Sequence, residues 1–312
     1  MSVLQLFNLL IFPGLLFLLF YALFCAALSR RLDARMQKRR GPRWLQPAAD
    51  LLKLIGKEKM VPARADQGIF FMVPAVALAA VCTAFLYVPL YSAQSAHAFA
   101  GDLIVILYLI TLPTLCVFLA GWYSSSMFAA FGGVRALTQM AAYQVPLLMS
   151  FLSPAVLADS WSLLGISQFY AERPLLLLAN LPAFAVAVVA SQGKLMHSPF
   201  DAPVAGAEQG SGAYTELGGR FFAMFHLAEE CETVVVISLI AAVFLPFYPA
   251  SPLLGLALYL IKTLFILFLF ALFRTLSVRL HTEQVFSLCW RYLVPLALIQ
   301  LIVDLLLKGV IV

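Results

Sequence analysis

Long apolar runs recur along almost the whole of this 312-residue chain. Hydrophobic residues make up 63% of the sequence and charged residues only 11%, more apolar surface than a water-soluble domain of this length buries. A run of about 18 or more apolar residues can cross a bilayer as a helix, which satisfies its own backbone hydrogen bonds. The sequence predicts eight such helices, at residues 2–29, 69–90, 102–121, 140–158, 175–192, 221–246, 254–274 and 289–311.

The predicted fold class is therefore all-α, a polytopic membrane protein with one integral membrane domain and no internal repeat. The first run lacks a preceding basic segment and is too long for a signal peptide, so we expect it to be retained. All but three of the 20 Lys and Arg residues lie in the loops that follow odd-numbered runs. Because Lys and Arg favour the cytoplasmic side, we expect both termini on the outer side of the cell membrane. The net charge of +5 belongs to these loops and gives no reason to expect nucleic acid.

The segment PRWLQPAADLLKLIGKE predicts an interfacial amphipathic helix at about residues 43–58. Its apolar side chains, Trp44 and Leu51 among them, share one face, whereas Asp50, Lys53 and Lys57 lie on the other. Two interpretations stay open: a plain anchor at the membrane surface, or the floor of a docking site for a partner. The predicted docking residues are Arg39, Arg40, Asp50, Lys53, Arg274 and Arg279.

A second long loop, SPFDAPVAGAEQGSGAYTELGGR at residues 198–220, is polar and rich in glycine. It carries Asp201, Glu208 and Glu216, and its glycines disfavour a helix. A solvated connecting loop is one interpretation. The other is a hydrated cleft at the cytoplasmic mouth of the bundle, where the three acids exchange protons.

The sixth run contains ionisable residues inside an apolar segment. His226, Glu229 and Glu230 are spaced so that one helix face presents all three, with Glu229 about 13 Å from the start of the run. Acids at such depth usually face a bundle interior or a wet cavity. A structural role stays open for each residue, and a proton relay is favoured for Glu229.

Two other ionisable residues lie within predicted spans. Lys262 has either a structural partner or a transport role, whereas Asp304 is near the end of its run and is expected to snorkel or cap the helix. The five cysteines show no metal-ligand spacing, and no phosphate loop or dinucleotide fingerprint occurs. We therefore expect no metal and no cofactor in this chain, and no catalytic residue of its own.

Several segments together resemble one known family over nearly the whole chain. They include RRGPRWLQPAADLLKLIGKE (39–58), AGWYSSSMFAAFGGVRALTQMAAYQV (120–145), SPFDAPVAGAEQGSGAYTELGG and FFAMFHLAEE. The resemblance is to the membrane subunit shared by complex I, where it is subunit 1, and the energy-converting membrane-bound nickel–iron hydrogenases, formate hydrogenlyase included.

The resemblance implies tilted helices around a cavity that opens toward a hydrophilic arm. In the hydrogenase branch the expected partners are hydrogenase-like large and small subunits with a [NiFe] centre and [4Fe-4S] clusters, a ferredoxin-like iron–sulfur subunit and antiporter-like membrane subunits. In the quinone-linked branch the same cavity takes the quinone headgroup. Either way this chain would couple electron transfer to proton or sodium translocation.

Nine residues in all are predicted for a proton or coupling cavity, from the motifs of the resemblance and from the helical spacing of the sixth run. They are Arg135, Lys194, His197, Asp201, Glu208, Glu216, His226, Glu229 and Glu230. Several family acids are absent, because Lys194, Val204, Gly206 and Gln144 stand where the family has Glu. These departures put the family's usual proton route in doubt for this chain.

Three functions remain open at the level of sequence. The RRGP loop without an insertion and the VRLHTE loop favour the hydrogenase branch, whereas AGWYSSSMFAAFGGVRALTQM is more like the quinone-linked type. A stand-alone secondary transporter is the third, and the absence of repeats and broken spans disfavours it.

Overall fold

The computed structural model of the chain describes residues 9–12, 14–58, 67–95, 97–204, 212–249 and 251–311. These residues form helices joined by short loops, and none of them lies in a strand. In chain order the elements are α2 (Leu15–Met36), α3 (Gln46–Gly56), α4 (Gln67–Tyr87), α5 (Asp102–Leu109), α6 (Leu112–Tyr123), α7 (Met127–Leu157), α8 (Leu163–Glu172), α9 (Leu176–Ala179), α10 (Leu181–Lys194), η1 (Ala202–Val204), η2 (Gly212–Tyr214), α12 (Gly219–Phe244), α13 (Pro252–Leu276), α14 (Thr282–Leu288), η3 (Cys289–Leu293) and α15 (Val294–Ile311).

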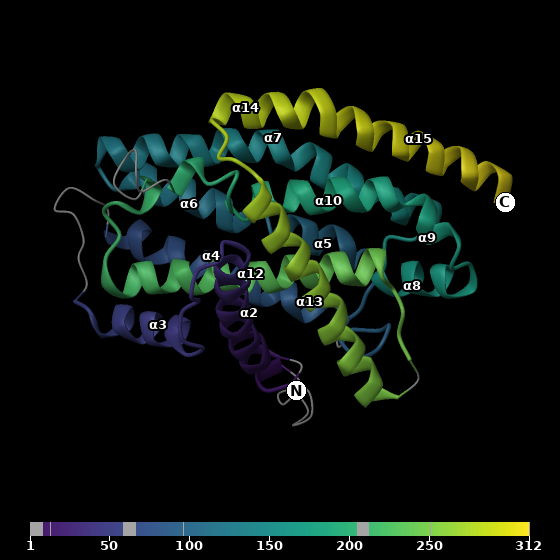
Figure 1. Ribbon diagram of the computed structural model, residues 1–312, viewed down its shortest axis with the longest axis horizontal. Helices are drawn as coiled ribbons and strands as arrows, with labels where there is room; N and C mark the ends of the chain where they lie inside the picture. The colour runs from purple at the N-terminus through teal and green to yellow at the C-terminus, as the bar shows by residue number, and fades with distance from the viewer. Residues whose placement is uncertain are drawn as a thin grey trace.

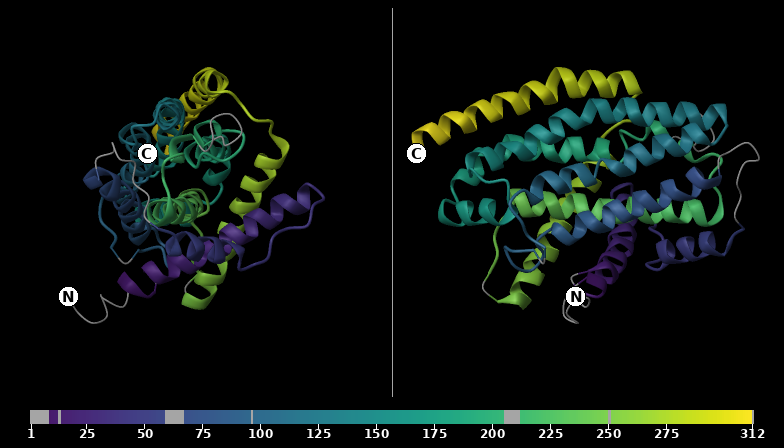
Figure 2. Two further views of the ribbon diagram at one scale, coloured as in Figure 1. Left: turned by 90° about the vertical axis from the view of Figure 1, so that its left-hand side faces the viewer. Right: turned by 180° about the vertical axis from the view of Figure 1, so that it is seen from behind.

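Helices α7, α10, α12 and α15 run along the long axis of the molecule, as Figure 1 shows. Helices α2 and α13 cross this bundle at a steep angle, and the end-on view in Figure 2 shows them against one of its sides. Helix α12 packs against α4, α2, α3 and α13, while α7 packs against α6, α10 and α15. The bundle therefore has α12 at its centre, with contacts to both groups.

Helix α12 has two unlike halves. From Cys231 to Phe244 every residue is buried, as expected for a segment that is apolar on nearly all sides. The first half instead carries Arg220, His226, Glu229 and Glu230. Most charges of the central helix thus lie toward one end of the bundle.

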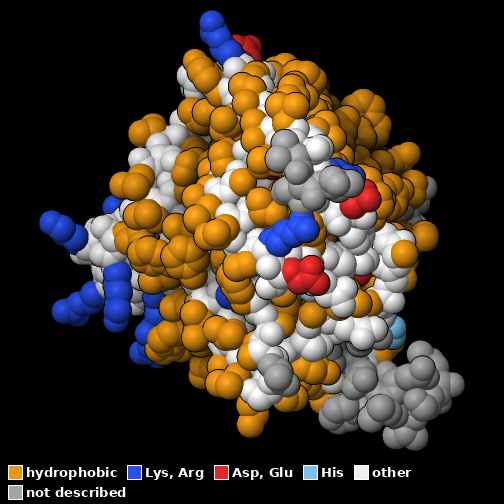
Figure 3. Space-filling model, turned by 90° about the vertical axis from the view of Figure 1, so that its right-hand side faces the viewer, with side chains coloured by type: hydrophobic (Ala, Val, Ile, Leu, Met, Phe, Trp, Pro, Cys, Tyr) orange, Lys and Arg blue, Asp and Glu red, His pale blue; other side chains and the backbone are white. Residues whose placement is uncertain are grey.

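Among the residues that the structure describes, six helices are long and apolar enough to cross a membrane: Leu15–Met36, Gly68–Tyr87, Asp102–Tyr123, Met127–Leu157, Pro252–Leu276 and Thr282–Gly309. The predicted set of eight differs from these six at two places. The expected span 175–192 is split between α9 and a 14-residue α10, which is about 21 Å long and shorter than a hydrocarbon core of about 30 Å. The expected span 221–246 is helical as α12, but its charges keep it out of the apolar set. Figure 3 shows one end of the molecule covered mainly by hydrophobic side chains, with Lys and Arg gathered at its edge.

Two predicted runs depart from regular α-helix next to a proline. The run 102–121 is interrupted between α5 and α6, because Pro113 in the first turn of α6 has no N–H to donate backward. Near the C-terminus a π-helical turn at Cys289–Leu293 precedes Pro295, and α14, this turn and α15 continue as one helix.

Helix α7 is much longer than its predicted span of 140–158. It begins at Met127, and two glycines allow close packing along the extension. A Cβ at Gly132 would lie 2.3 Å from the backbone N of Ala213, and one at Gly133 would lie 2.9 Å from the carbonyl oxygen of Phe118. The glycines let α6 and the loop at η2 pack directly on the α7 backbone.

The predicted amphipathic helix is present as α3, with bounds Gln46–Gly56. It buries Pro47 and Leu51 against the protein and leaves Leu45 and Leu52 exposed, at 78% and 68%. Asp50 does not face away with the polar side chains as expected. It bonds to Arg30 of α2, so α3 turns an acid toward the bundle.

Candidate functional site

A cluster of charged side chains joins α2, α3 and the polar half of α12. We call Arg30, Asp50, His226, Glu229 and Glu230 the charged cluster. The Arg30 guanidinium lies 3.2 Å from an Asp50 oxygen and 3.3 Å from a Glu230 oxygen. His226 lies 3.9 Å from Glu229 and 4.0 Å from Glu230, and these contacts are ion pairs only when the imidazole is protonated. The prediction that one face of this helix presents the histidine and both acids is confirmed in geometry.

The charged cluster is only partly open to the surface. The Glu230 and His226 side chains are 19% and 20% exposed, and Glu229 is 41% exposed. At such short separations and in a partly desolvated site, the charge state of each group depends strongly on its neighbours. The charged cluster therefore brings one imidazole and two carboxylates together beside Arg30.

A second group of polar residues lies on the other side of α12. Lys194 at the end of α10 forms a buried ion pair with Glu232, and its Nζ also donates to Thr114 at 3.0 Å. The Thr114 hydroxyl shares a 3.0 Å hydrogen bond with the Tyr143 hydroxyl on α7. A buried amine of this kind is stable only because a carboxylate and hydroxyls surround it. The family motif points to Lys194, but nothing local in the sequence points to Glu232, which lies 38 residues away.

Tyr214 connects the two groups. Its hydroxyl donates to Glu229 of the charged cluster, and it shares a small cavity of about 20 Å³ with Glu229, Lys194 and Glu232. Such a volume is enough for about one water molecule. Burial, and then the neighbouring Glu229 carboxylate, raise the pKa of the Tyr214 hydroxyl well above its usual range, which keeps it a donor.

His197 lies beside the charged cluster in a separate cavity. This cavity of about 120 Å³ is also lined by Arg30, Glu230 and Arg274. Burial, and then the positive charge of Arg274, lower the pKa of His197 to about 3, so the imidazole is neutral at physiological pH. The structure thus brings His197 together with Glu230 and keeps it uncharged there.

The two described acids of the glycine-rich loop, Asp201 and Glu216, lie in different surroundings. Asp201 pairs with Arg279 at 2.9 Å. Glu216 follows η2 and is partly exposed, whereas Glu208 lies outside the described residues, as does Gly206. No contact among the described residues joins Asp201 or Glu216 to the charged cluster.

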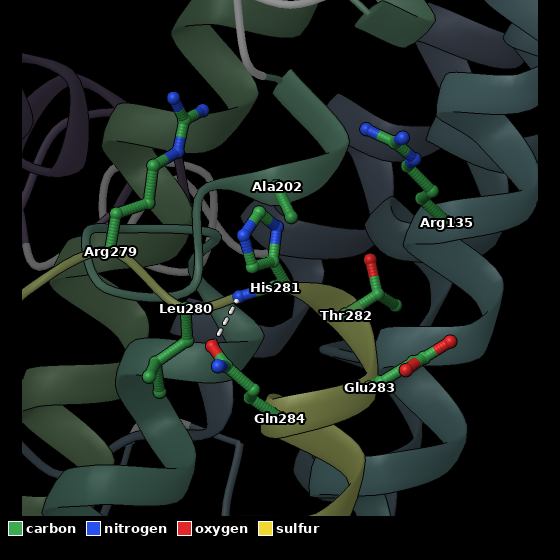
Figure 4. A pocket seen from close by; sticks show the side chains of 8 residues that line it. All are labelled: Arg135, Ala202, Arg279, Leu280, His281, Thr282, Glu283 and Gln284. Atoms are coloured by element: carbon green, nitrogen blue, oxygen red, sulfur yellow. Dashed lines mark hydrogen bonds between the residues drawn. The ribbon is translucent and has the colours of Figure 1, made fainter.

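Arg135 faces a different cavity from the one expected. It projects from α7 into a cavity of about 580 Å³, with Arg279 on the opposite side, His281 between them and Glu283 on the side of Arg135 (Figure 4). His281 begins α14, where its backbone N–H donates to Gln284 Oε1 at 3.0 Å. The residues that line this cavity do not include Lys194, His197 or the ionisable residues of α12, so the described residues of the predicted set are divided between separate cavities.

Half of the predicted docking residues are held by contacts within the chain. Arg274 pairs with Asp33 at 2.5 Å, Arg279 with Asp201, and Asp50 with Arg30. The other three, Arg39, Arg40 and Lys53, are exposed. The surface around α3 is thus the part of the predicted docking set that is open to a partner.

Asp304 is neither a snorkelling residue nor a helix cap. It is completely buried in α15, where it accepts hydrogen bonds from Ser153 of α7 and from Gln300 at 3.1 Å. Ser153 in turn lies 3.2 Å from Asn180, so the carboxylate ties three segments together. The position near the end of an apolar run gives no sign of these partners.

Lys262 has structural partners in the loop that follows α12. Its Nζ donates to the Phe247 carbonyl at 2.5 Å and lies 4.6 Å from the centre of the Tyr248 ring.

Among the residues that the structure describes, no three His, Cys, Asp or Glu side chains come together as a metal site.

Comparison with known proteins decides the family. The family model described as NADH dehydrogenase matches residues 9–305. The chain belongs to the NADH dehydrogenase family. It is 34% identical over 290 residues to a subunit of the NADH-quinone oxidoreductase of Syntrophotalea carbinolica, covering 88% of each chain. The family resemblance inferred from the sequence motifs is thereby confirmed.

Other members of the family are similar over most of their length. NADH-quinone oxidoreductase subunit 8 of Thermus thermophilus is 33% identical over 294 residues, which cover 90% of this chain and 80% of that protein. A chain of the membrane-bound sulfane sulfur reductase, an archaeal respiratory membrane complex, superimposes with a TM-score of 0.85. That match covers 93% of this chain and 96% of the other at 24% identity, and it shows the shared fold.

Proposed function

We propose that this chain is the membrane-anchoring and energy-coupling subunit of a complex I-like enzyme. In this proposal it docks a hydrophilic redox arm and links electron transfer there to proton or sodium translocation in the membrane. The charged cluster is the single observation that carries the proposal. Ionisable groups within an apolar bundle are costly and are usually retained for function.

The geometry of the cluster supports a coupling role. Arg30 neutralises Asp50 and Glu230 together, while His226 lies about equally close to Glu229 and Glu230. A change of charge in a docked arm near Arg30 would alter how strongly Arg30 interacts with Asp50 and with Glu230. Because close charges shift one another's protonation, a proton would then move within His226, Glu229 and Glu230.

From the charged cluster, a proton would next move toward Lys194. Tyr214 and the one-water cavity lie between Glu229 and the Lys194–Glu232 pair. This arrangement offers a short link from Glu229 across α12 to the side that faces α7 and α10. The link differs from the family pattern by having a lysine where the family has a glutamate.

The anchoring role rests on the surface around α3. Arg39, Arg40 and Lys53 supply positive charge, and Leu45 and Leu52 supply exposed apolar contacts beside them. A basic rim around an apolar centre suits a partner with an acidic rim. The same exposed leucines also suit the membrane interface, where α3 would lie flat.

We propose further that the arm is of the nickel–iron hydrogenase type, with eight segments in the membrane and both termini outside. Its support is the direct RRGP junction before α3 and the VRLHTE loop. In this branch the [NiFe] centre and [4Fe-4S] clusters lie in partner subunits, and antiporter-like subunits pack in the membrane.

A quinone-linked enzyme is the second candidate. It is favoured by the relatives, whose names are those of NADH-quinone oxidoreductase subunits. In this branch a cleft under Trp44 and Arg39 would receive a quinone headgroup.

Purification of the native complex through a tag on this chain separates the candidates. The hydrogenase proposal expects stoichiometric nickel and hydrogen evolution from reduced ferredoxin or formate. A complex without nickel that reduces quinone with NADH would replace it by the second candidate. A chain that purifies alone and moves ions in liposomes would contradict both.

A further inference from the structure

A buried polar cluster lies around Asp304, away from the charged cluster. Figure 1 shows the second half of α15 near α9, whereas α12 begins at the other end of the bundle beside α3. The side chains of Asp304 and Ser153 are 0% exposed, and that of Asn180, at the start of α10, is 1% exposed. We call Asp304, Gln300, Ser153, Asn180 and Tyr170 the Asp304 cluster.

No cation pairs with Asp304 among the residues that the structure describes. Lys308 lies one turn further along α15, and its Nζ pairs with Asp159 at 2.6 Å, near the surface. An ionised carboxylate that is buried without a counter-charge loses its hydration and gains only hydrogen bonds in return. An ionised Asp304 would therefore be costly at this place.

The other charged residues of the neighbouring elements do not supply a counter-charge. In α8, which carries Tyr170, Glu172 is exposed, and Arg173 after it lies 5.5 Å from the centre of the Phe169 ring. The charged residues of α7, α10, η3 and α14 lie more than three turns away along their helices, or more than about 16 Å. They are Arg135, Lys194, Arg291 and Glu283.

The contacts of Ser153 need one more proton than an ionised Asp304 leaves there. Ser153 Oγ bonds to an Asp304 oxygen and also lies 3.2 Å from Asn180 Oδ1. The amide nitrogen of Asn180 donates to the Tyr170 hydroxyl at 2.5 Å, so its Oδ1 faces Ser153 as an acceptor. A serine has one O–H, whereas an amide oxygen and a carboxylate only accept. Two contacts thus share a single proton if Asp304 is ionised.

We propose that Asp304 is a proton-binding site, which holds its proton at neutral pH. The Asp304 O–H then donates to Ser153, in place of the reverse direction that an ionised group requires. Ser153 in turn donates to Asn180 Oδ1. The other Asp304 oxygen is the carbonyl oxygen of the acid, and it accepts from Gln300 Nε2 at 3.1 Å. Each of these contacts now has one donor and one acceptor, and no charge remains in the core.

The bound proton joins α15 and α10 to α7. Without it, Ser153 can donate either to Asp304 of α15 or to Asn180 beside α10, and the other contact is lost. Release of the proton therefore loosens one of two helix contacts, which makes the Asp304 cluster a proton-dependent lock. The cluster shares no residue with the charged cluster, so the proposal is independent of the coupling function.

Infrared spectroscopy of the whole purified complex tests the proton directly, because a protonated carboxyl group has its own carbonyl stretch. We expect this band in the difference between wild type and Asp304→Asn at neutral pH, where an exposed aspartate, with a pKa of about 3.9, is ionised. Asp304→Asn keeps an N–H for Ser153 and a carbonyl for Gln300, so the complex should assemble. A difference that contains only carboxylate bands would overturn the proposal.

Ser153→Ala tests the hydrogen bond of the acid while Asp304 stays in place. It should shift the acid band, because the O–H of Asp304 loses its acceptor. Ser150→Ala is the matched control, since it removes an equally buried hydroxyl of α7 that bonds to the Leu147 carbonyl of its own helix. It should leave the band unchanged. A band that Ser153→Ala does not move would overturn the assignment.

Asp159→Asn is the control for the residue that carries the band. Asp159 is an acid near the same end of the bundle, with a side chain that is 81% exposed. Its replacement should leave the acid band at full intensity. Loss of the band in Asp159→Asn would assign the proton to the surface pair and contradict a site at Asp304.

Discussion

Three glutamates within one turn of α12 have three different surroundings. Glu230 bonds to Arg30, Glu229 accepts from Tyr214, and Glu232 pairs with Lys194. The helix places Glu230 and Glu232 on opposite sides, toward α2 and toward α10. A single short sequence thus supplies acids to two polar regions that the central helix keeps apart.

The Lys194–Glu232 pair gives the sharpest prediction at this scale. The Lys194 side chain is 0% exposed and Glu232 is 6% exposed. Lys194→Met would leave a buried carboxylate without its partner, which we expect to cost about 3–5 kcal/mol of stability. The thermal midpoint of the purified complex measures the loss.

The double variant Lys194→Met with Glu232→Gln serves as the control for Lys194→Met. It removes both charges and should recover part of the midpoint, because no unpaired ion remains. A single variant as stable as the wild type would show that the pair does not hold α10 and α12 together.

His197 predicts a dependence of stability on pH. Burial and Arg274 hold its pKa at about 3 in the folded chain, against about 6.5 in an unfolded one. Between these values the unfolded chain binds more protons, so this stability is complete above about pH 6.5 and is lost as the pH falls toward 3. The loss is at most about 1.4 kcal/mol per pH unit.

Thermal midpoints of wild type and His197→Gln between pH 7 and pH 5 check this slope. The wild type should lose midpoint more steeply than the variant over that range. Parallel curves would mean that another group causes the acid sensitivity.

At the scale of elements, a glycine fixes how α12 begins. Gly219 has a φ of +57°, and a Cβ there would lie 2.1 Å from the Glu58 carbonyl oxygen. Glu58 follows α3, so this close approach joins α3 to the start of α12 and to the charged cluster. Only glycine allows both the left-handed conformation and the short distance.

Gly219→Ala should therefore destabilise the α3–α12 contact. The left-handed conformation alone costs an alanine about 1–2 kcal/mol, and the overlap with Glu58 adds to it. Gly56→Ala is the control, since nothing lies within 4 Å of a Cβ there. A lowered thermal midpoint for Gly219→Ala and an unchanged or raised one for Gly56→Ala is the expected result. Equal midpoints would mean that the loop after α3 adjusts freely.

Periodicity and hydropathy predict the elements well where the segments are long and uniform. The runs that form α4 and α13, and the amphipathic α3, follow closely from the sequence, whereas α2 ends at Met36 rather than at the predicted residue 29. The number of membrane spans does not follow from the sequence. Helix α10 is too short, and α12 carries too many charges, to be counted as a span by length and apolarity. Pro113, Gly132 and Gly133 set helix bounds and packing through local sterics. These effects do not appear in a hydropathy value averaged over a window of residues.

The site shows the same division between local and long-range information. The spacing of His226, Glu229 and Glu230 is local, so the sequence predicts their shared face. Their partners Arg30 and Tyr214, and the partner of Lys194, lie far away in the chain. Arg135 is assigned to the site by motif alone, and the fold places it in another cavity.

At the scale of the whole molecule, exposed positive charge is concentrated where a soluble arm would dock. The exposed Arg39 and Arg40 precede α3 and lie apart from the buried pairs. Arg39→Ala with Arg40→Ala should weaken association of the arm, and the difference from wild type should shrink as salt rises, because salt screens surface charges. The yield of arm subunits with tagged membrane subunit at two salt concentrations measures it.

Arg43→Ala is the matched comparison, since Arg43 is also exposed beside α3. A smaller loss for Arg43→Ala would assign docking to the pair. An intact complex after both changes at Arg39 and Arg40 would leave these residues with the role of fixing topology only.

Ion translocation by a Glu229→Gln complex tests the coupling role most directly. The amide keeps the size of the side chain and its acceptor oxygen for Tyr214, but it carries no titratable proton. In proteoliposomes we expect the assembled variant complex to retain its subunits and lose most ion movement per electron. Full ion movement per electron in an intact Glu229→Gln complex would contradict the account.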